Sequence, residues 1–277
     1  MKILPLYLFL LLGFFSIANT PAYANALKKN EIIFGSVAMD TPAMMHRRLS
    51  PLTEFLSNTL GLPVSLKLSS NMKQAIKDVN DGSVHLAYLT PVAYIHTREQ
   101  SNSQLIVKTL TQNKGWFQLM IVVRKDSPIQ NIKDLVGKSF AFGDPAALLQ
   151  RAAVVGAGVP LEKLSKQEFL GHYDNIARAV RRGFYDAGIL KDTTALKWKN
   201  EGLRVIYASP ELPPYNITAN EKLSPELFNK IRNAFLQLDP NDPKDHIVIK
   251  ALDNNYTGFA ATNDAEYDIV RELIKPF

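Results

Sequence analysis

Residues 84–94 read VHLAYLTPVAY, and this stretch predicts a strand that passes directly into a helix. Val84 to Leu89 has the apolar composition of a strand. Thr90 and Pro91 then open a helix, with threonine as the N-cap and proline in the first turn. A strand followed at once by a helix is the repeating unit of α/β folds.

The same alternation precedes this stretch. We expect strands at Glu31–Val37 and Val64–Leu68, and helices at Arg47–Leu60, which Gly61 ends, and at Met72–Val79. This β-α-β-α-β order predicts a parallel sheet with helices on both faces. Ligands of such sheets bind beyond the carboxyl ends of the strands. The Val37–His46 loop and the Leu89–Tyr94 turn therefore become candidate site segments.

A second β/α set follows, and a tail of different character closes the chain. The set comprises strands at 117–124, 139–142, 167–170, 185–190 and 203–207, with helices at 131–135, from 143 to about 155, and at about 175–182 and 193–199. Ser209 to Tyr215 holds three prolines and is typical of a connector. Mainly helices are expected after it, at 225–238, about 244–254 and 264–274.

This order predicts two lobes. We expect the tail helices to pack back onto the first lobe, so that the chain crosses between lobes near residues 110–115 and 208–216. Two crossings make a hinge. The predicted domains are a signal peptide at 1–26, a first lobe at 27–112 plus 212–277, and a second lobe at 113–211.

The N-terminus has the layout of a secretory signal peptide. Met1-Lys2 is basic, Ile3–Ile17 is almost wholly apolar, and Ala22-Tyr23-Ala24 and Ala24-Asn25-Ala26 both fit an A-x-A cleavage rule. A retained anchor is the alternative, but the apolar run is short for a membrane span of about 20 residues. The chain has no cysteine, so it is neither a lipid-anchored receptor nor stabilised by disulfides. We expect export to the periplasm.

Charge and motifs exclude several function classes. The formal net charge is +6, but basic and acidic residues alternate, and the densest basic cluster, at 178–182, is typical of a solvated helix face; nucleic acid is not an expected partner. There is no G-x-S-x-G, no P-loop and no H-E-x-x-H, and Gly156-Ala157-Gly158 lacks the third glycine of a dinucleotide fingerprint. The histidines are scattered. We therefore expect no catalytic residues, no metal and no cofactor.

Several motifs occur in a fixed order along the mature chain. They are Ile33–Gly35, Pro51–Leu56 with Leu60–Val64, Asp81–Tyr94, Asp126–Ile129, Asp134–Lys138, Phe140–Pro145, Gly171-His172 with Asn175, and Asp264–Asp268. Together this set resembles the periplasmic phosphonate-binding proteins of phosphonate ABC transporters. The resemblance implies a type II two-lobed periplasmic binding fold that closes on a small-molecule ligand like a hinge and delivers it to a membrane permease. We expect a monomer.

The family resemblance also implies where the ligand sits. Phosphonate receptors of this family carry a Ser-Thr-Ser-Gly-like run after GDP, whose hydroxyls and helix N–H groups hold the anion. Here the run reads Ala146-Ala147-Leu148, so the helix start survives and the hydroxyls do not. Several lost charge-assisted hydrogen bonds, each about 1.5–3 kcal/mol, would weaken phosphonate binding a thousandfold or more. The ligand is therefore either an anion held by backbone groups or a larger, more apolar molecule.

The candidate ligand contacts lie at expected strand ends and helix starts. They are Met39, Asp40, Thr41, Thr90, Tyr94, Ala146, Ala147, Leu148, His172, Tyr173 and Asp186. His172 stands out among the histidines because it sits where a strand should run into a helix. For Tyr94 the alternative is a packed aromatic residue, and for Asp186 it is a strand-end or capping residue.

Three functions follow from this reading. The first is a transport receptor that docks on an ABC permease. The second is a sensor in which the same receptor signals to a membrane kinase or cyclase. The third, an enzyme built on this fold, is disfavoured by the missing catalytic motifs.

Overall fold

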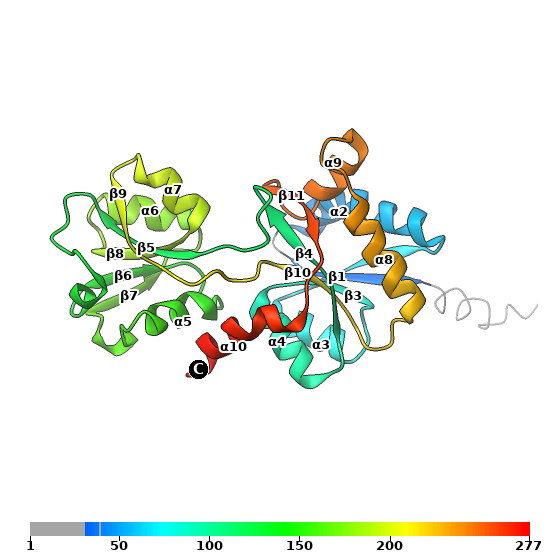
Figure 1. Ribbon diagram of the computed structural model, residues 1–277, viewed down its shortest axis with the longest axis horizontal. Coiled ribbons are helices and arrows are strands. Elements are labelled where there is room, and N and C mark those ends of the chain that lie inside the picture. The colour runs from blue at the N-terminus through cyan, green and yellow to red at the C-terminus, as the bar shows by residue number, and fades with distance from the viewer. Residues whose placement is uncertain (1–30, 39) are drawn as a thin grey trace, which may run out of the picture. The chain divides into compact units, whose positions relative to one another are not determined.

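The computed structural model describes residues 31–38 and 40–277, which contain two β-sheets with helices packed on them (Figure 1). The predicted signal peptide at 1–26 and the candidate Met39 lie outside the described residues. In the part of the chain that is described, no helix is both long and apolar enough to cross a membrane.

The first sheet has six strands in the order β11-β4-β10-β3-β1-β2. Their bounds are β1 Ile32–Val37, β2 Val64–Ser69, β3 Leu86–Leu89, β4 Gln104–Thr111, β10 Asn216–Ala219 and β11 Tyr256–Ala260. β1 is parallel to β2 and β3, whereas β10 is antiparallel to β3 and β4, and β11 to β4. The predicted parallel pairing of the first three strands is confirmed, and the sheet continues with three strands in mixed orientation.

Helices cover both faces of this sheet. They are α2 (Pro42–Leu60), α3 (Met72–Asn80), α4 (Pro91–Gln100), α8 (Pro225–Gln237) and α9 (Pro243–Lys250). The apolar stripe of α2, including Leu49, Leu52 and Leu56, is fully buried, and Gly61 ends the helix in the left-handed conformation at φ 69°. α2 begins at Pro42, earlier than the predicted Arg47, because Pro42 occupies its first turn.

Strand β3 shows how the two faces are divided. Tyr88 packs in the core beneath α2 and α8, while Ala87 and Leu89 pack in the core with α3 and α4. Adjacent side chains of a strand point to opposite faces, so this division follows from the alternation of the backbone. The Thr90 side chain accepts a hydrogen bond from the Ala93 amide at 3.1 Å, which confirms the predicted helix cap.

The second sheet has five strands in the order β7-β6-β8-β5-β9. Its elements are β5 Leu119–Arg124, η1 Ile132–Leu135, β6 Ser139–Phe142, α5 Leu148–Gly156, η2 Leu161–Lys163, β7 Lys166–Phe169, α6 Tyr173–Arg181, β8 Ala187–Lys191, α7 Asp192–Lys199 and β9 Leu203–Ala208. β6 is parallel to β7 and β8, and β5 is antiparallel to β8 and β9.

The two sheets share one connectivity. In each sheet, three parallel strands lie beside one antiparallel strand, which is β10 in the first sheet and β5 in the second. Each of these antiparallel strands is the first that the chain forms after it leaves the other sheet: β5 comes after β4, and β10 comes after β9. The two crossing segments, residues 112–118 and 209–215, pair with each other. The amides of Phe117 and Leu212 each donate to the other residue's carbonyl at 2.9 Å.

The tail after residue 215 is mainly helical, as predicted, but it also contains two short strands that the prediction missed. It supplies β10 and β11 to the first sheet before the chain ends in η3 (Asp264–Tyr267) and α10 (Asp268–Ile274). β10 is four residues long and wholly buried, and β11 contains Gly258 at φ 151°. Such short strands lack a clear two-residue period, so their pairing partners define them.

Helix α10 contacts helices that belong to both sheets. Tyr267, the last residue of η3 and the N-cap of α10, packs on Tyr94 of α4 with ring centroids 4.7 Å apart. Leu273 lies so close to Gly156 of α5 that a Cβ there would be 2.7 Å from its Cδ2 atom. The end of the chain therefore holds α4 and α5 through direct packing.

Candidate ligand-binding site

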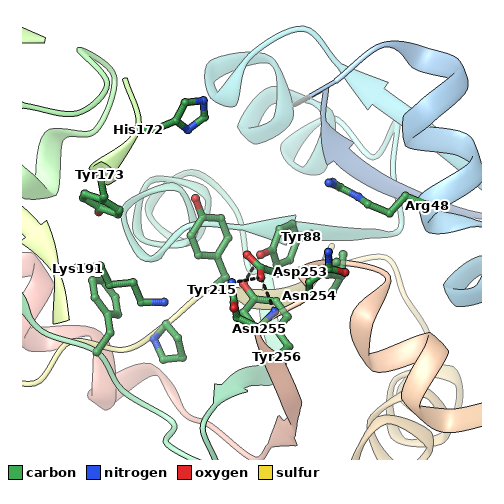
Figure 2. Close-up of a pocket in the computed structure, with 13 residues that line it drawn as sticks. Arg48, Tyr88, His172, Tyr173, Lys191, Tyr215, Asp253, Asn254, Asn255 and Tyr256 are labelled. Atoms are coloured by element: carbon green, nitrogen blue, oxygen red, sulfur yellow. Dashed lines mark hydrogen bonds between the residues drawn. The ribbon is translucent and has the colours of Figure 1, made fainter. Parts of the chain in front are cut away.

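A cavity of about 580 Å³ is lined by side chains from both sheets (Figure 2). The first sheet and its helices supply Arg48, Tyr88, Leu252, Asp253, Asn254, Asn255 and Tyr256; the second supplies His172, Tyr173 and Lys191; the crossing segments supply Phe117, Pro214 and Tyr215. This volume lies within the roughly 300–1,000 Å³ that small-molecule pockets occupy.

Strand ends account for several of these positions. Lys191 is the last residue of β8, and Tyr88 is the residue before the end of β3. His172 lies between β7 and α6. These are carboxyl ends of strands or the turns that follow them, where α/β sheets bind ligands.

One side of the cavity is basic. It is lined by Lys191 and His172, and α6 begins there with His172 as its N-cap, while Arg48 of α2 lines the opposite side (Figure 2). The His172 side chain makes no capping hydrogen bond. The start of a helix has backbone N–H groups without intrahelical partners and carries the positive end of the dipole. An anion placed here would meet backbone donors as well as the Lys191 ammonium and the His172 ring.

The other side is aromatic. Tyr88 and Tyr215 are stacked, with centroids 4.9 Å apart and planes at 26°, and Tyr256 meets Tyr88 edge-on at 6.5 Å. The hydroxyls of Tyr88 and Tyr256 are hydrogen-bonded to each other. Burial raises the pKa of Tyr88, Tyr215 and Tyr256 above the ordinary tyrosine value. All three phenols are therefore neutral at physiological pH.

The loop between α9 and β11 supplies the acidic residue Asp253. Its Oδ1 accepts hydrogen bonds from the backbone N and the side-chain Nδ2 of Asn255, at 2.8 and 3.0 Å (Figure 2). Lys250 donates to the Asn254 carbonyl at 2.7 Å. These bonds hold the loop in place and leave less of the Asp253 carboxylate available to a ligand.

Gln150 of α5 connects the turn after β6 with the cavity. Its Oε1 accepts from the Gly143 amide at 2.7 Å, and its Nε2 donates to the Tyr173 hydroxyl at 3.4 Å. Burial raises the pKa of Tyr173 to about 12. Tyr173 thus remains a neutral phenol held by a buried amide.

Of the predicted residues that the structure describes, His172 and Tyr173 line the cavity and the others do not. The Tyr94 ring is buried and its hydroxyl donates to Asp264 at 2.7 Å. Asp40 is exposed and accepts from the Thr41 amide. Asp186 accepts from the backbone N and Oγ of Ser139 at 2.8 and 2.7 Å, before the amino end of β8, whereas Lys191 at the carboxyl end lines the cavity.

The helix start at α5 is also outside the cavity lining. The Ala146 amide donates to the Asp144 carboxylate at 2.7 Å, the Ala147 amide to the Asp144 carbonyl at 2.9 Å, and the Leu148 amide to the Ala146 carbonyl at 2.9 Å. These three amides are engaged by a local turn. Their role as anion donors stays a prediction.

Sequence reasoning missed most of the aromatic side. The strand-end rule was available for Lys191 and Tyr88, but Tyr215 was included in a proline-rich connector. The stretch from Leu252 to Tyr256 lies in a tail that was expected to be mainly helical. No local pattern marks these residues, because they reach the cavity through the crossing segments and the pairing of β11.

Comparison with known families identifies the fold and its class. A family model described as "ABC transporter, phosphonate, periplasmic substrate-binding protein" matches residues 34–267. The chain belongs to this family. The family consists of periplasmic substrate-binding proteins of ABC transporters. Such proteins bind a small molecule and act together with a membrane permease.

Individual family members are distant but cover most of the chain. The phosphate-import protein PhnD of Mycolicibacterium smegmatis is 23% identical over 87% of this chain and 84% of its own length. The phosphonates-binding periplasmic protein of Escherichia coli is 24% identical over 92% and 78%. The structure of PhnD1 from Prochlorococcus marinus in complex with methylphosphonate has a TM-score of 0.70 at 20% identity, covering 89% of this chain and 98% of that one. These matches establish the two-lobed α/β fold.

Proposed function

We propose that this substrate-binding protein captures a phosphonate or related phosphorus oxyanion in the cavity and delivers it to an ABC permease. The observation that carries the proposal is the convergence of Lys191, His172, Arg48 and the start of α6 on one cavity. Charge-assisted hydrogen bonds are the strong ones in anion recognition, and a helix start adds backbone donors. The names of the M. smegmatis and E. coli relatives support a phosphate or phosphonate ligand.

The two crossing segments between the lobes provide a route for the lobes to close on a ligand. We infer that the lobes are 27–112 plus 212–277 and 113–211, and that the paired crossing segments at Phe117 and Leu212 act as the hinge. A ligand that contacts Lys191 on one side and Tyr88 or Arg48 on the other favours the closed state, because its affinity for that state is higher. The closed monomer then docks on the permease in the periplasm, after removal of the signal peptide at 1–26.

The test is a binding screen on the exported protein purified from the periplasm. Phosphate, phosphite and methylphosphonate are each titrated while the melting temperature is followed, with calorimetry for those that shift it. A ligand at a hundredfold its Kd stabilises the folded state by about 2.7 kcal/mol, so a shift of several degrees is expected from at least one of them.

A matched pair of lysine substitutions locates the site. Lys191→Met removes one charge-assisted contact of about 1.5–3 kcal/mol, which predicts roughly 10- to 100-fold weaker oxyanion binding. Lys199→Met, at an exposed position near the end of α7, should bind as the parent does. Silence from every oxyanion, or equal affinities in the two variants, contradicts the proposal.

A further inference from the structure

We propose that the ligand carries a flat unsaturated ring that stacks on Tyr215, in addition to the anionic group held near Lys191 and His172. This inference rests on the proposed function and narrows the substrate class of the same cavity. It would make the cargo an aromatic or heteroaromatic phosphonate or phosphate rather than a bare oxyanion.

The first argument is size. The cavity of about 580 Å³ falls in the range that encloses drug-sized organic ligands. A bare oxyanion such as phosphate consists of a single tetrahedral group and would contact only the basic side. The remaining lining would stay without a partner; it includes tyrosines, a phenylalanine, a proline and a leucine beside the polar residues 253–255.

The second argument is the rigidity of the aromatic surface. Tyr88 is only 5% exposed, and its hydroxyl is hydrogen-bonded to the buried Tyr256. Tyr215 stacks on Tyr88 at 4.9 Å, lines the cavity, and extends into it in Figure 2. A tyrosine backed by a fixed ring loses little conformational freedom when a second ring stacks on it. Offset stacking is the arrangement that aromatic pairs prefer.

The third argument concerns charge, and it distinguishes a ring from an ammonium group. Tyrosines also form cages for organic cations, and Asp253 lies on this side of the cavity. However, Asp253 already accepts two hydrogen bonds from Asn255, and the Lys191 ammonium lies 5.4 Å from the Phe117 ring centroid. Arg48 also lines the cavity, so an ammonium group on the ligand would meet the positive charges of both Lys191 and Arg48 and is disfavoured. A neutral ring on the ligand meets no such repulsion.

The two parts of the ligand can belong to one small molecule. Tyr215 and Tyr173, which lies at the start of α6, both line this cavity. Phe117 and Pro214, on the crossing segments, also line this cavity. The stacking surface and the anion-binding end therefore share one space.

The experiment compares ligands that differ only in the group attached to phosphorus. Phenylphosphonate, cyclohexylphosphonate and methylphosphonate are titrated into the exported protein by calorimetry. Stacking beyond simple apolar burial predicts that the phenyl compound binds about 3- to 10-fold more tightly than the cyclohexyl compound. This comparison needs no variant, so it does not depend on any substitution being tolerated.

Variants of Tyr215 test the residue itself. Tyr215→Leu should abolish the preference for phenyl over cyclohexyl, while Tyr215→Phe should keep it. Tyr207→Leu, at a half-buried tyrosine of β9 outside the cavity, serves as the matched control and should keep it too. Benzoate and benzenesulfonate are included as aromatic anions without phosphorus.

Each outcome decides one of the two proposals. If cyclohexyl- or methylphosphonate binds as tightly as phenylphosphonate, the ring inference is wrong and the proposed function stands. If no phosphonate binds but benzoate or benzenesulfonate does, in a manner that Tyr215→Leu abolishes, the ring inference stands and the phosphorus assignment is wrong. If none of these compounds binds, and phosphate and phosphite do not bind either, both are overturned.

Discussion

Helices α5 and α6 both begin after a parallel strand of the second sheet, yet only α6 begins at the cavity. At α5 the carboxylate and carbonyl of Asp144 accept the amides of Ala146 and Ala147. At α6 the N-cap is His172, whose side chain makes no capping bond. The comparison teaches that two helix starts in the same position after parallel strands need not both reach the ligand cavity.

Gln150 links the two helix starts, and its loss should have the largest effect on folding. Gln150→Leu leaves the buried Gly143 amide without its acceptor and Tyr173 without its amide partner. An unpaired buried polar group costs about 1–3 kcal/mol, so the free energy of unfolding in urea should fall by that amount. Gln130→Leu, at an exposed position, is the control and should change it by less than about 0.5 kcal/mol. If Gln150→Leu has the same free energy of unfolding as the parent protein, Gln150 does not connect the starts of α5 and α6.

Restoring hydroxyls to α5 tests whether that helix start takes part in binding at all. The double substitution Ala146→Ser with Ala147→Thr adds two donors at the positions where phosphonate receptors of the family carry them. Since these residues lie outside the cavity lining, methylphosphonate affinity should change by less than about threefold, equivalent to 0.7 kcal/mol. A gain of tenfold or more, measured by calorimetry, would instead show that α5 reaches the ligand in the bound state.

The smallest effect expected is a pH dependence at the α6 end. Burial raises the pKa of Tyr173 to about 12, above the ordinary value of 10.0, so the folded state favours the neutral phenol. The resulting stabilisation is complete below pH 10 and is lost as the pH rises from 10 toward 12. Tyr173→Phe should flatten the decline of melting temperature across this window relative to the parent protein. An unchanged slope would mean that Tyr173 does not titrate there.

Local sequence predicted most of the secondary structure because its determinants lie within a few residues. The apolar stripe of α2, the left-handed Gly61 and the Thr90 cap each act through neighbours less than two turns away. β6 has the predicted bounds Ser139–Phe142. The ordered motifs further indicated the family, and the family model confirms it.

Sequence located only part of the candidate site. His172 and Tyr173 were identified because a single turn after a strand marks them. Tyr88, Tyr215 and Tyr256 were not, since they are separated by more than 120 and 40 residues along the chain and meet only when β10 and β11 pair into the first sheet.

The sequence by itself determined the alternation of strands and helices, the caps that begin and end many of them, and the family. Tertiary structure alone decided which strand ends and which helix start share a cavity. The physical reason is one of range. Helix caps and apolar periodicity are set by contacts between near neighbours, whereas the cavity depends on two chain crossings and on strand pairings between distant segments.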